Sequence, residues 1–150
     1  KCEGGEAVND PIRITVEEPW LVPARQYPGD AGADLKAKEI AFIEPGECEV
    51  VGTGVAIAIP YGYAGLVFPR SGLATKEGLR LANCVGVIDH QYRDEIKVPL
   101  YNDSGQTRAV SRGERVAQLV ILPIELPEFP VVDSLPPTDR GKGGFGSTGV

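Results

Sequence analysis

Two short segments combine charged side chains with turn-forming residues in patterns that suit chemistry on an anionic ligand. In the first, residues 69–74 (Pro-Arg-Ser-Gly-Leu-Ala), Arg70 and Ser71 stand at the start of a predicted short helix over 71–77. Unpaired N–H groups and the positive end of the dipole favour an anion at a helix N-terminus. This segment predicts a phosphate site. The alternative interpretation is an ordinary Ser71 N-cap preceded by a solvated arginine.

The second segment, residues 86–96, has two apolar arms around a polar turn, which predicts a hairpin with Asp89 in its turn. A carboxylate held there beside a ligand can act as a general base. The alternative is a turn-forming aspartate that binds nearby backbone N–H groups. His90 is the only histidine. Since successive residues of an extended segment face opposite sides, we interpret His90 as an exposed turn residue and not as a partner of Asp89.

Two further polar side chains stand in segments that suit a binding site. Asp34 follows Gly32 in the segment Ala-Gly-Ala-Asp-Leu, where a carboxylate suits metal-bound water or plain loop chemistry. Gln118 lies mid-strand among apolar neighbours in residues 112–119, which read as a turn followed by a core strand. A buried amide is tolerated only when it is hydrogen-bonded, so we expect Gln118 to have a partner.

The C-terminal segment changes in composition, first to proline and then to glycine. Residues 127–150 cannot form a core, and we expect them to be a flexible arm or an ordinary linker. Phe145 stands alone among glycines, with Arg140 before it and Ser147 after it. That pattern also suits an arm that stacks an aromatic ring on a base and surrounds phosphates.

The rest of the chain predicts an all-β domain over residues 1–126 with one short helix. Nineteen glycines and 13 prolines among 150 residues argue against a helical bundle. Short β-rich segments separated by turn signals are typical of a sandwich or barrel. The predicted strands cover 12–17, 48–59 with a bulge at Gly52 and Gly54, 65–68, 96–101 and 115–122.

Charge and cysteine content exclude several classes of function. Fifteen basic and 21 acidic residues give a net charge of −6, which is unsuited to general nucleic-acid binding. No apolar run reaches the roughly 18 residues that a membrane span requires, so we expect no membrane partner. Cys2, Cys48 and Cys84 form no CxxC pair, which indicates neither a disulfide framework nor a zinc site. We therefore expect a cytoplasmic protein.

Taken together and in order, five segments resemble the five motifs of the homotrimeric dUTPases. The resemblance spans residues 12 to 149 and rests on 31–35, 69–74, 86–89 with Tyr92, 112–119, and 140–149. It implies a jelly roll, or distorted β-barrel, that assembles as a homotrimer with three active sites at the interfaces. It also implies that the C-terminal arm caps a neighbour's site.

The resemblance further implies Mg²⁺-assisted hydrolysis of dUTP to dUMP and pyrophosphate, which limits uracil incorporation into DNA and supplies dUMP. Asp89 would activate the water that attacks the α-phosphorus, Tyr92 would pack under the sugar, and Asp34 would contact the metal through water. The implied substrate-binding residues are Arg70, Ser71, Gly72, Asn83, Val87, Ile88, Asp89, Tyr92, Lys97, Gln118, Arg140, Phe145, Gly146, Ser147 and Thr148.

Three residues depart from the family's pattern. His90 and Gln91 stand where small or acidic residues are more common, and Asp94 stands where glycine is usual. One alternative is a dCTP deaminase, or a bifunctional enzyme, of the same fold, which would release ammonia from dCTP. Another is a non-catalytic jelly-roll module; the presence of Asp89, Gln118 and residues 140–148 argues against it.

Overall fold

Alternating apolar and polar residues between turns produce short strands throughout the computed structural model, which describes residues 11–144. Within this range the chain forms eleven strands and two helical turns. The strands are β1 (Ile14–Val16), β2 (Ala33–Lys36), β3 (Ala41–Ile43), β4 (Cys48–Gly52), β5 (Val55–Ile57), β6 (Tyr63–Phe68), β7 (Leu79–Leu81), β8 (Gly86–Ile88), β9 (Lys97–Asn102), β10 (Arg108–Val110) and β11 (Arg115–Pro123). The helical turns are η1 (Pro19–Leu21) and η2 (Leu73–Glu77).

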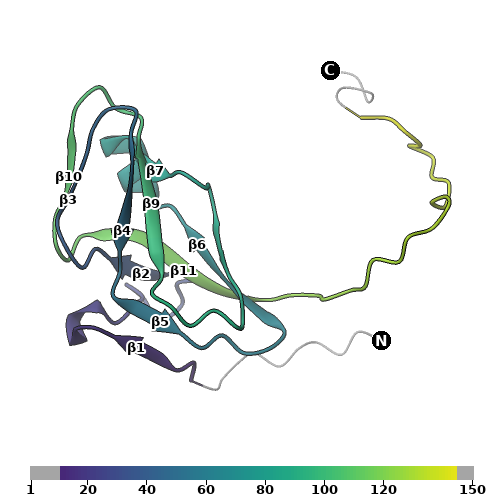
Figure 1. Ribbon diagram of the computed structural model, residues 1–150, viewed down its shortest axis with the longest axis horizontal. Helices are drawn as coiled ribbons and strands as arrows, with labels where there is room; N and C mark the ends of the chain where they lie inside the picture. Colours follow the sequence, from purple (N-terminus) through teal and green to yellow (C-terminus); the bar gives the residue numbers. More distant parts are fainter. Residues whose placement is uncertain (1–10, 145–150) are drawn as a thin grey trace.

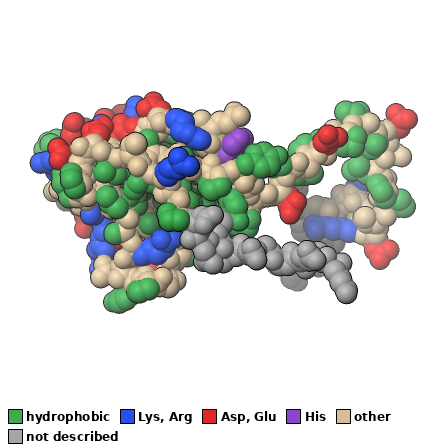
Figure 2. Space-filling view, turned by 90° about the horizontal axis from the view of Figure 1, so that it is seen from below, with side chains coloured by type: hydrophobic (Ala, Val, Ile, Leu, Met, Phe, Trp, Pro, Cys, Tyr) green, Lys and Arg blue, Asp and Glu red, His purple; other side chains and the backbone are tan. Residues whose placement is uncertain are grey.

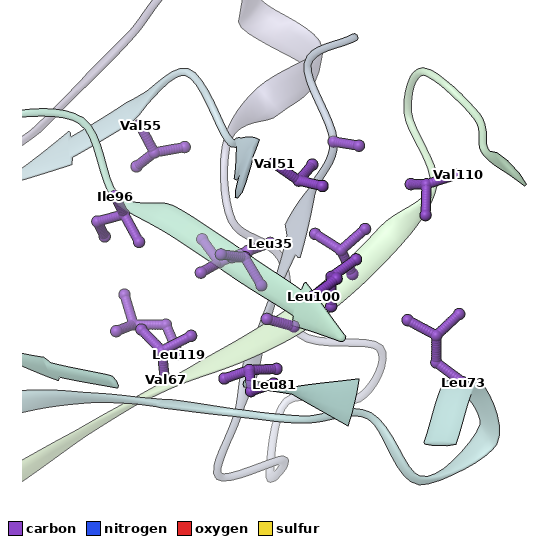
Figure 3. Close-up of a cluster of buried hydrophobic side chains, with 14 of the residues drawn as sticks. Leu35, Val51, Val55, Val67, Leu73, Leu81, Ile96, Leu100, Val110 and Leu119 are labelled. Atoms are coloured by element: carbon purple, nitrogen blue, oxygen red, sulfur yellow. The ribbon is translucent and has the colours of Figure 1, made fainter. Parts of the chain in front are cut away.

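The strands form four antiparallel groups that surround one interior (Figure 1). Their orders are β2-β11-β6-β8, β4-β9-β7, β1-β5 and β10-β3. The fold is therefore all-β, as predicted, although the groups do not join into one continuous closed barrel. Figure 3 shows side chains from several of these strands, among them Leu35, Val67, Leu100 and Leu119, meeting in the shared core.

The segment predicted as one strand over 48–59 is instead two strands in different groups. β4 pairs with β9, whereas β5 pairs with β1. Between them, the Thr53 hydroxyl donates to the Ile96 carbonyl (2.6 Å), and Gly54 has a φ of +65° that glycine adopts easily. The glycines therefore mark a change of sheet and not a bulge in one strand.

The hairpin predicted over 86–96 is also wrong. β8 pairs with β6, and β9 pairs with β4 and β7. Residues 89–96 therefore connect two different sheets. The arms are apolar because each packs on the common core, and not because they pair with each other.

The predicted short helix is present, but Ser71 does not cap it. Its N-cap is Gly72, without a side-chain hydrogen bond, and the Ser71 carbonyl accepts from the Thr75 hydroxyl (2.8 Å). Gly78 ends η2 with a φ of +69°, as expected of a C-terminal glycine. Neither helical turn found in residues 11–144 has the length and apolar character needed to cross a membrane.

Beyond β11 the chain leaves the folded body. The Ile124 N–H donates to the Gly62 carbonyl (2.9 Å), and the following residues run outward (Figure 1). Figure 2 shows hydrophobic side chains on this outlying segment, where Phe129 is 88%, Val131 100% and Leu135 82% exposed. Apolar side chains at this exposure suit contact with another surface.

One buried polar side chain joins three parts of the core. Asn102 is fully buried; its Nδ2 donates to the carbonyls of Ile43 and Gln106 (both 2.8 Å). Its Oδ1 accepts from the Ser104 backbone N–H (2.9 Å). β9, β3 and the turn after β9 therefore depend on one amide.

We predict that Asn102→Ala lowers the free energy of unfolding by about 2–4 kcal/mol, because it leaves buried backbone groups without partners. The measurement is urea unfolding at a fixed protein concentration. Gln106→Ala is the control, because only the backbone carbonyl of Gln106 bonds to Asn102. A loss below about 1 kcal/mol for Asn102→Ala would contradict this role.

Candidate active site

The first of two candidate cavities lies beside β8 and has a volume of about 260 Å³. Backbone and side chains from β8, from the turn before it and from the start of β9 form its walls. Six of the predicted substrate-binding residues line it: Asn83, Val87, Ile88, Asp89, Tyr92 and Lys97. β8 is the last strand of its sheet, so its outer edge offers backbone donors and acceptors to a ligand.

The loop after β8 holds Asp89 and Tyr92 through hydrogen bonds of its own. The Tyr92 N–H donates to the Asp89 carbonyl (3.1 Å), and the Tyr92 hydroxyl donates to the Glu95 carbonyl (2.8 Å). Arg93 donates to the carbonyls of His90 (2.6 Å) and Tyr92 (2.8 Å). Asp89 is exposed to solvent, where water reaches its carboxylate.

Two of the three unusual positions of this loop, His90 and Asp94, have identifiable surroundings. His90 is half-buried and not exposed as predicted, because its ring packs edge-on against Tyr61 with centroids 5.4 Å apart. The Asp94 carboxylate accepts from the Glu95 N–H (2.7 Å). Asp94 does not adopt the left-handed conformation for which glycine is favoured, since Cys84 is the one non-glycine residue with positive φ among residues 11–144.

The second cavity has a volume of about 420 Å³ and lies where β6 leads into η2. It is lined by five predicted residues, Asp34, Arg70, Ser71, Gly72 and Gln118, together with Gln26, Asp30, Ala31, Gly32 and Arg115. β2 supplies Asp34, β11 supplies Gln118, and the link after β6 supplies Arg70. These segments meet because β11 pairs with both β2 and β6.

Asp34 orients two arginine side chains in this cavity. Its Oδ1 is 2.9 Å from Arg70 Nε, and its Oδ2 is 3.2 Å from Arg115 Nη1. The Asp34 side chain is only 17% exposed, so the pairs are shielded more than ordinary surface ion pairs. Two guanidinium groups held side by side favour a multivalent anion such as a phosphate chain.

Gln118 has the hydrogen bond that its position required. Its Nε2 donates to the Pro69 carbonyl (3.1 Å) and thereby links β11 to the segment that carries Arg70. Gly32 lies against this amide, and a Cβ built on Gly32 would collide with Gln118 Oε1. The second cavity therefore depends on a close approach that only glycine allows.

Arg115 is the main residue of this site that sequence reasoning missed. Strict alternation along a strand places residues 115 and 118 on opposite faces. However, the pairing of β11 with β2 shifts register between Arg115 and Ala117. Val116 is the extra residue, and it is buried next to buried Ala117. The consecutive apolar pair was the available signal for this bulge.

The structure does not bring the two cavities together. β8 and β11 pair with opposite edges of β6. Asp89 follows Ile88 of β8, which pairs with Gly65 of β6, whereas Gln118 of β11 pairs with Phe68 at the far end of β6. Strand spacing and rise then separate the backbones of Asp89 and Gln118 by roughly 15 Å.

Arg140 lines neither cavity and donates to the Gly143 carbonyl (2.9 Å). Phe145, Gly146, Ser147 and Thr148 lie outside the described residues.

The second cavity has a donor set that fits a hydrated cation. The described residues contain no group of three or more His, Cys, Asp or Glu side chains that forms a metal cage. Asp30 and Asp34 are the carboxylates lining this cavity, and both Asp34 oxygens already bind arginines. Mg²⁺ commonly keeps several waters and binds through one or two carboxylates plus substrate phosphates, which these residues suit.

Comparisons with known proteins show the family of this chain. The sequence model of the dUTPase family matches residues 18–149. The chain belongs to the dUTPase family. It is 52% identical over 139 residues to the deoxyuridine 5'-triphosphate nucleotidohydrolase of Corynebacterium glutamicum, covering 92% of both chains. The enzyme of the same name from Rhodococcus erythropolis is 52% identical over 129 residues, which cover 85% of this chain and 79% of that one.

Solved structures show the same likeness. A mutant dUTPase of Staphylococcus bacteriophage 80alpha, solved with dUpNHpp, has a TM-score of 0.86 and 30% identity, with 94% of this chain and 99% of that chain covered. A mutant dUTPase of phage phi11 of S. aureus, described with a structural Mg(II) ion, has a TM-score of 0.75 and 28% identity, with 83% and 98% covered. The predicted family and jelly-roll class are confirmed, and the chain is a hydrolase of nucleotide metabolism.

We predict that Gly32→Ala weakens the binding of inorganic pyrophosphate at least about fivefold, because the new methyl group displaces the Gln118 amide from its bond to Pro69. The measurement is titration calorimetry. Gly29→Ala is a matched control in the same loop, because a Cβ there meets nothing within 4 Å. Equal dissociation constants for the two variants would contradict the prediction.

Proposed function

We propose that the chain hydrolyses dUTP to dUMP and pyrophosphate, and so limits uracil incorporation into DNA and supplies dUMP. The observation that carries this proposal is that a chain of the dUTPase family has two cavities with complementary chemistry. One offers a strand edge, an exposed carboxylate and an aromatic ring, and the other offers two arginines fixed by one aspartate. A nucleoside triphosphate presents groups that suit both.

The β8 cavity would bind the nucleoside. The outer backbone edge from Val87 to Asp89, with Asn83 and Lys97 nearby, suits the polar edge of uracil. Tyr92 would pack under the deoxyribose, where a ribose 2′-hydroxyl would collide with its ring. The hydrogen bond from the Tyr92 hydroxyl to the Glu95 carbonyl supports this role, since it limits movement of the ring.

The second cavity, called the arginine cavity from here on, would bind the triphosphate through Arg70, Ser71, Gly72 and Gln118. We add Arg115 to this set. A triphosphate brings about four negative charges, which a chain of net charge −6 must compensate locally. Mg²⁺, when bound to the phosphates, supplies further charge neutralisation, and Asp34 would contact it through water. Asp34 would also keep both guanidinium groups directed at the phosphates.

In the reaction, the Asp89 carboxylate would accept a proton from a water molecule as that water's oxygen attacks the α-phosphorus. The bond between the α-phosphorus and its bridging oxygen breaks, and pyrophosphate leaves with the electron pair. Arg70 would stabilise the charge that develops on the departing phosphates. The exposed position of Asp89 supports this role, because the reacting water can reach it.

Each complete site would combine two chains of a homotrimer. The separation of Asp89 from Gln118 supports this arrangement, because one substrate must contact both cavities at adjacent atoms. A closed ring of three chains makes three equivalent sites, each with the β8 cavity of one subunit and the arginine cavity of its neighbour.

The unpaired thiols of Cys48 and Cys84 suit a reducing, cytoplasmic location.

Residues 127–150 would form an arm, distinct from the β domain of residues 1–126, that crosses to a neighbouring subunit's site. The outward course of residues 127–144 and the exposed apolar side chains among them support this role. Arg140, Phe145, Gly146, Ser147 and Thr148 would close the site over base and phosphates. Ordering the arm costs roughly 1–2 kcal/mol of backbone entropy per residue, so substrate contacts must compensate for it.

Pyrophosphate release from dUTP, dCTP, dTTP and UTP, with and without Mg²⁺, tests the proposed function. We expect Mg²⁺-stimulated release from dUTP and far slower release from the other three nucleotides. Ammonia release from dCTP would overturn the proposal in favour of a deaminase of the same fold. Absence of turnover with every nucleotide would favour a binding module.

We predict that Asp89→Asn lowers kcat for dUTP by about 10²–10⁴-fold while dUTP still binds, because the amide keeps the shape but cannot accept a proton. Single-turnover pyrophosphate release measures the chemical step. Asp94→Asn is the control, because its side-chain oxygen still accepts from the Glu95 N–H in the same loop. A kcat for Asp89→Asn within about tenfold of wild type would refute its role as the base.

A further inference from the structure

The loop that carries Asp89 and Tyr92, residues 89–95, is joined to the rest of the molecule by the Glu95 side chain and, directly after it, by buried Ile96, whose N–H donates to the Val55 carbonyl (2.8 Å). Residues 89–95 contain several internal hydrogen bonds. Among the hydrogen bonds found within residues 11–144, those that join this loop to the rest of the chain all end on the Glu95 carboxylate. Its Oε1 accepts from the Gly54 N–H (2.7 Å) and lies 3.0 Å from Lys38 Nζ.

Lys38 is itself held firmly. Its ammonium group donates to Glu17 (2.8 Å), and its backbone N–H donates to the Gly52 carbonyl (2.9 Å). The hydrogen bonds to Glu17 and Glu95 hold the pKa of Lys38 above its ordinary value, so the lysine stays charged. The Lys38 and Glu95 side chains are 23% and 16% exposed, which shields this pair from solvent more than a typical surface ion pair.

The surrounding backbone is shaped to admit this pair. A Cβ on Gly52 would come within 2.7 Å of both Glu95 Oε1 and Lys38 Cε, so a larger residue there would push the pair apart. The edge-on packing of His90 on Tyr61 also leaves the loop, and Tyr61 is 74% exposed. Such a ring contact restrains direction less than charged hydrogen bonds do.

The same residue also contacts the sugar-facing side chain. The Tyr92 hydroxyl donates to the Glu95 carbonyl (2.8 Å), three residues along the loop. Glu95 therefore binds Tyr92 through its backbone and the β4–β5 connection through its side chain. Without the bonds of the carboxylate, this end of the loop would be held by the Ile96 backbone alone, whose N–H donates to the Val55 carbonyl (2.8 Å) and whose carbonyl accepts from Thr53 (2.6 Å). The Glu95 carbonyl, and with it the Tyr92 ring, would then gain freedom to move.

We propose that Glu95, held by Lys38 and the Gly54 N–H, is a positioning residue that fixes the Tyr92 ring and so sets the discrimination between deoxyribose and ribose triphosphates. This inference rests on the proposed function, in which Tyr92 excludes the 2′-hydroxyl. Neither Glu95 nor Lys38 lines the β8 cavity, so they act through Tyr92 and not on the substrate. A displacement of about 1 Å at the ring is sufficient to change such steric selection.

The test compares kcat/KM for dUTP and UTP in Lys38→Met, Glu95→Gln and the control Glu17→Gln. The ratio of the two constants does not depend on the fraction of folded enzyme, so a purely structural defect would leave it unchanged. We expect the ratio to fall about three- to tenfold in Lys38→Met and Glu95→Gln. It should stay at the wild-type value in Glu17→Gln, which keeps the Lys38–Glu95 pair, and return toward it in Lys38→Arg.

Tyr92→Phe completes a double-mutant cycle. It removes the hydroxyl that reaches Glu95 and keeps the ring, so Lys38→Met should change the ratio little further in this background. Additive effects of Lys38→Met and Tyr92→Phe would overturn the inference. So would an unchanged ratio in Lys38→Met and Glu95→Gln when wild-type enzyme prefers dUTP. A wild-type enzyme that does not turn over dUTP would instead overturn the proposed function.

Discussion

β6 pairs with a different strand on each of its edges, and this arrangement determines where the two cavities lie. β11 on one edge of β6 places Gln118 beside the link that carries Arg70, and β8 on the other edge places Asp89 at the opposite end. Neither cavity can move toward the other without breaking the sheet. A rigid sheet therefore keeps the carboxylate of one chain away from its own arginines, which makes association with a second chain part of the proposed mechanism.

Local electrostatics compensates for an acidic chain. The net charge of −6 repels a triphosphate at long range, but Asp34 gathers Arg70 and Arg115 at one point. Asp34 thus neutralises part of the positive charge of the two arginines but fixes the direction of both guanidinium groups. The Lys38–Glu95 pair uses the same device near the other cavity, where it ties the loop of residues 89–95 to the rest of the chain.

Sequence patterns predicted what local chemistry determines. Alternation gave the strands at 65–68, 96–101 and 115–122 close to their observed bounds, and Gly78 correctly ended the helix. The failures concern pairing between distant segments. The 48–59 segment resembles one strand and the 86–96 segment resembles one hairpin, yet each divides between two sheets that share one core. Arg115 was missed because a register shift in β11 overrides simple alternation. The contacts of Glu95 depend on three separate segments, which no local pattern reports.

Mixing two inactive variants tests the shared site most directly. Asp89→Asn chains keep the arginine cavity, and Arg70→Gln chains keep the β8 cavity. If each site takes one cavity from each of two neighbouring chains, random assortment of equal amounts gives about one intact site in four, and therefore about a quarter of wild-type dUTP turnover. Turnover that stays at the level of the separate variants, after subunit exchange shown by mass spectrometry of mixed trimers, would contradict the account, because both cavities would then serve the same chain.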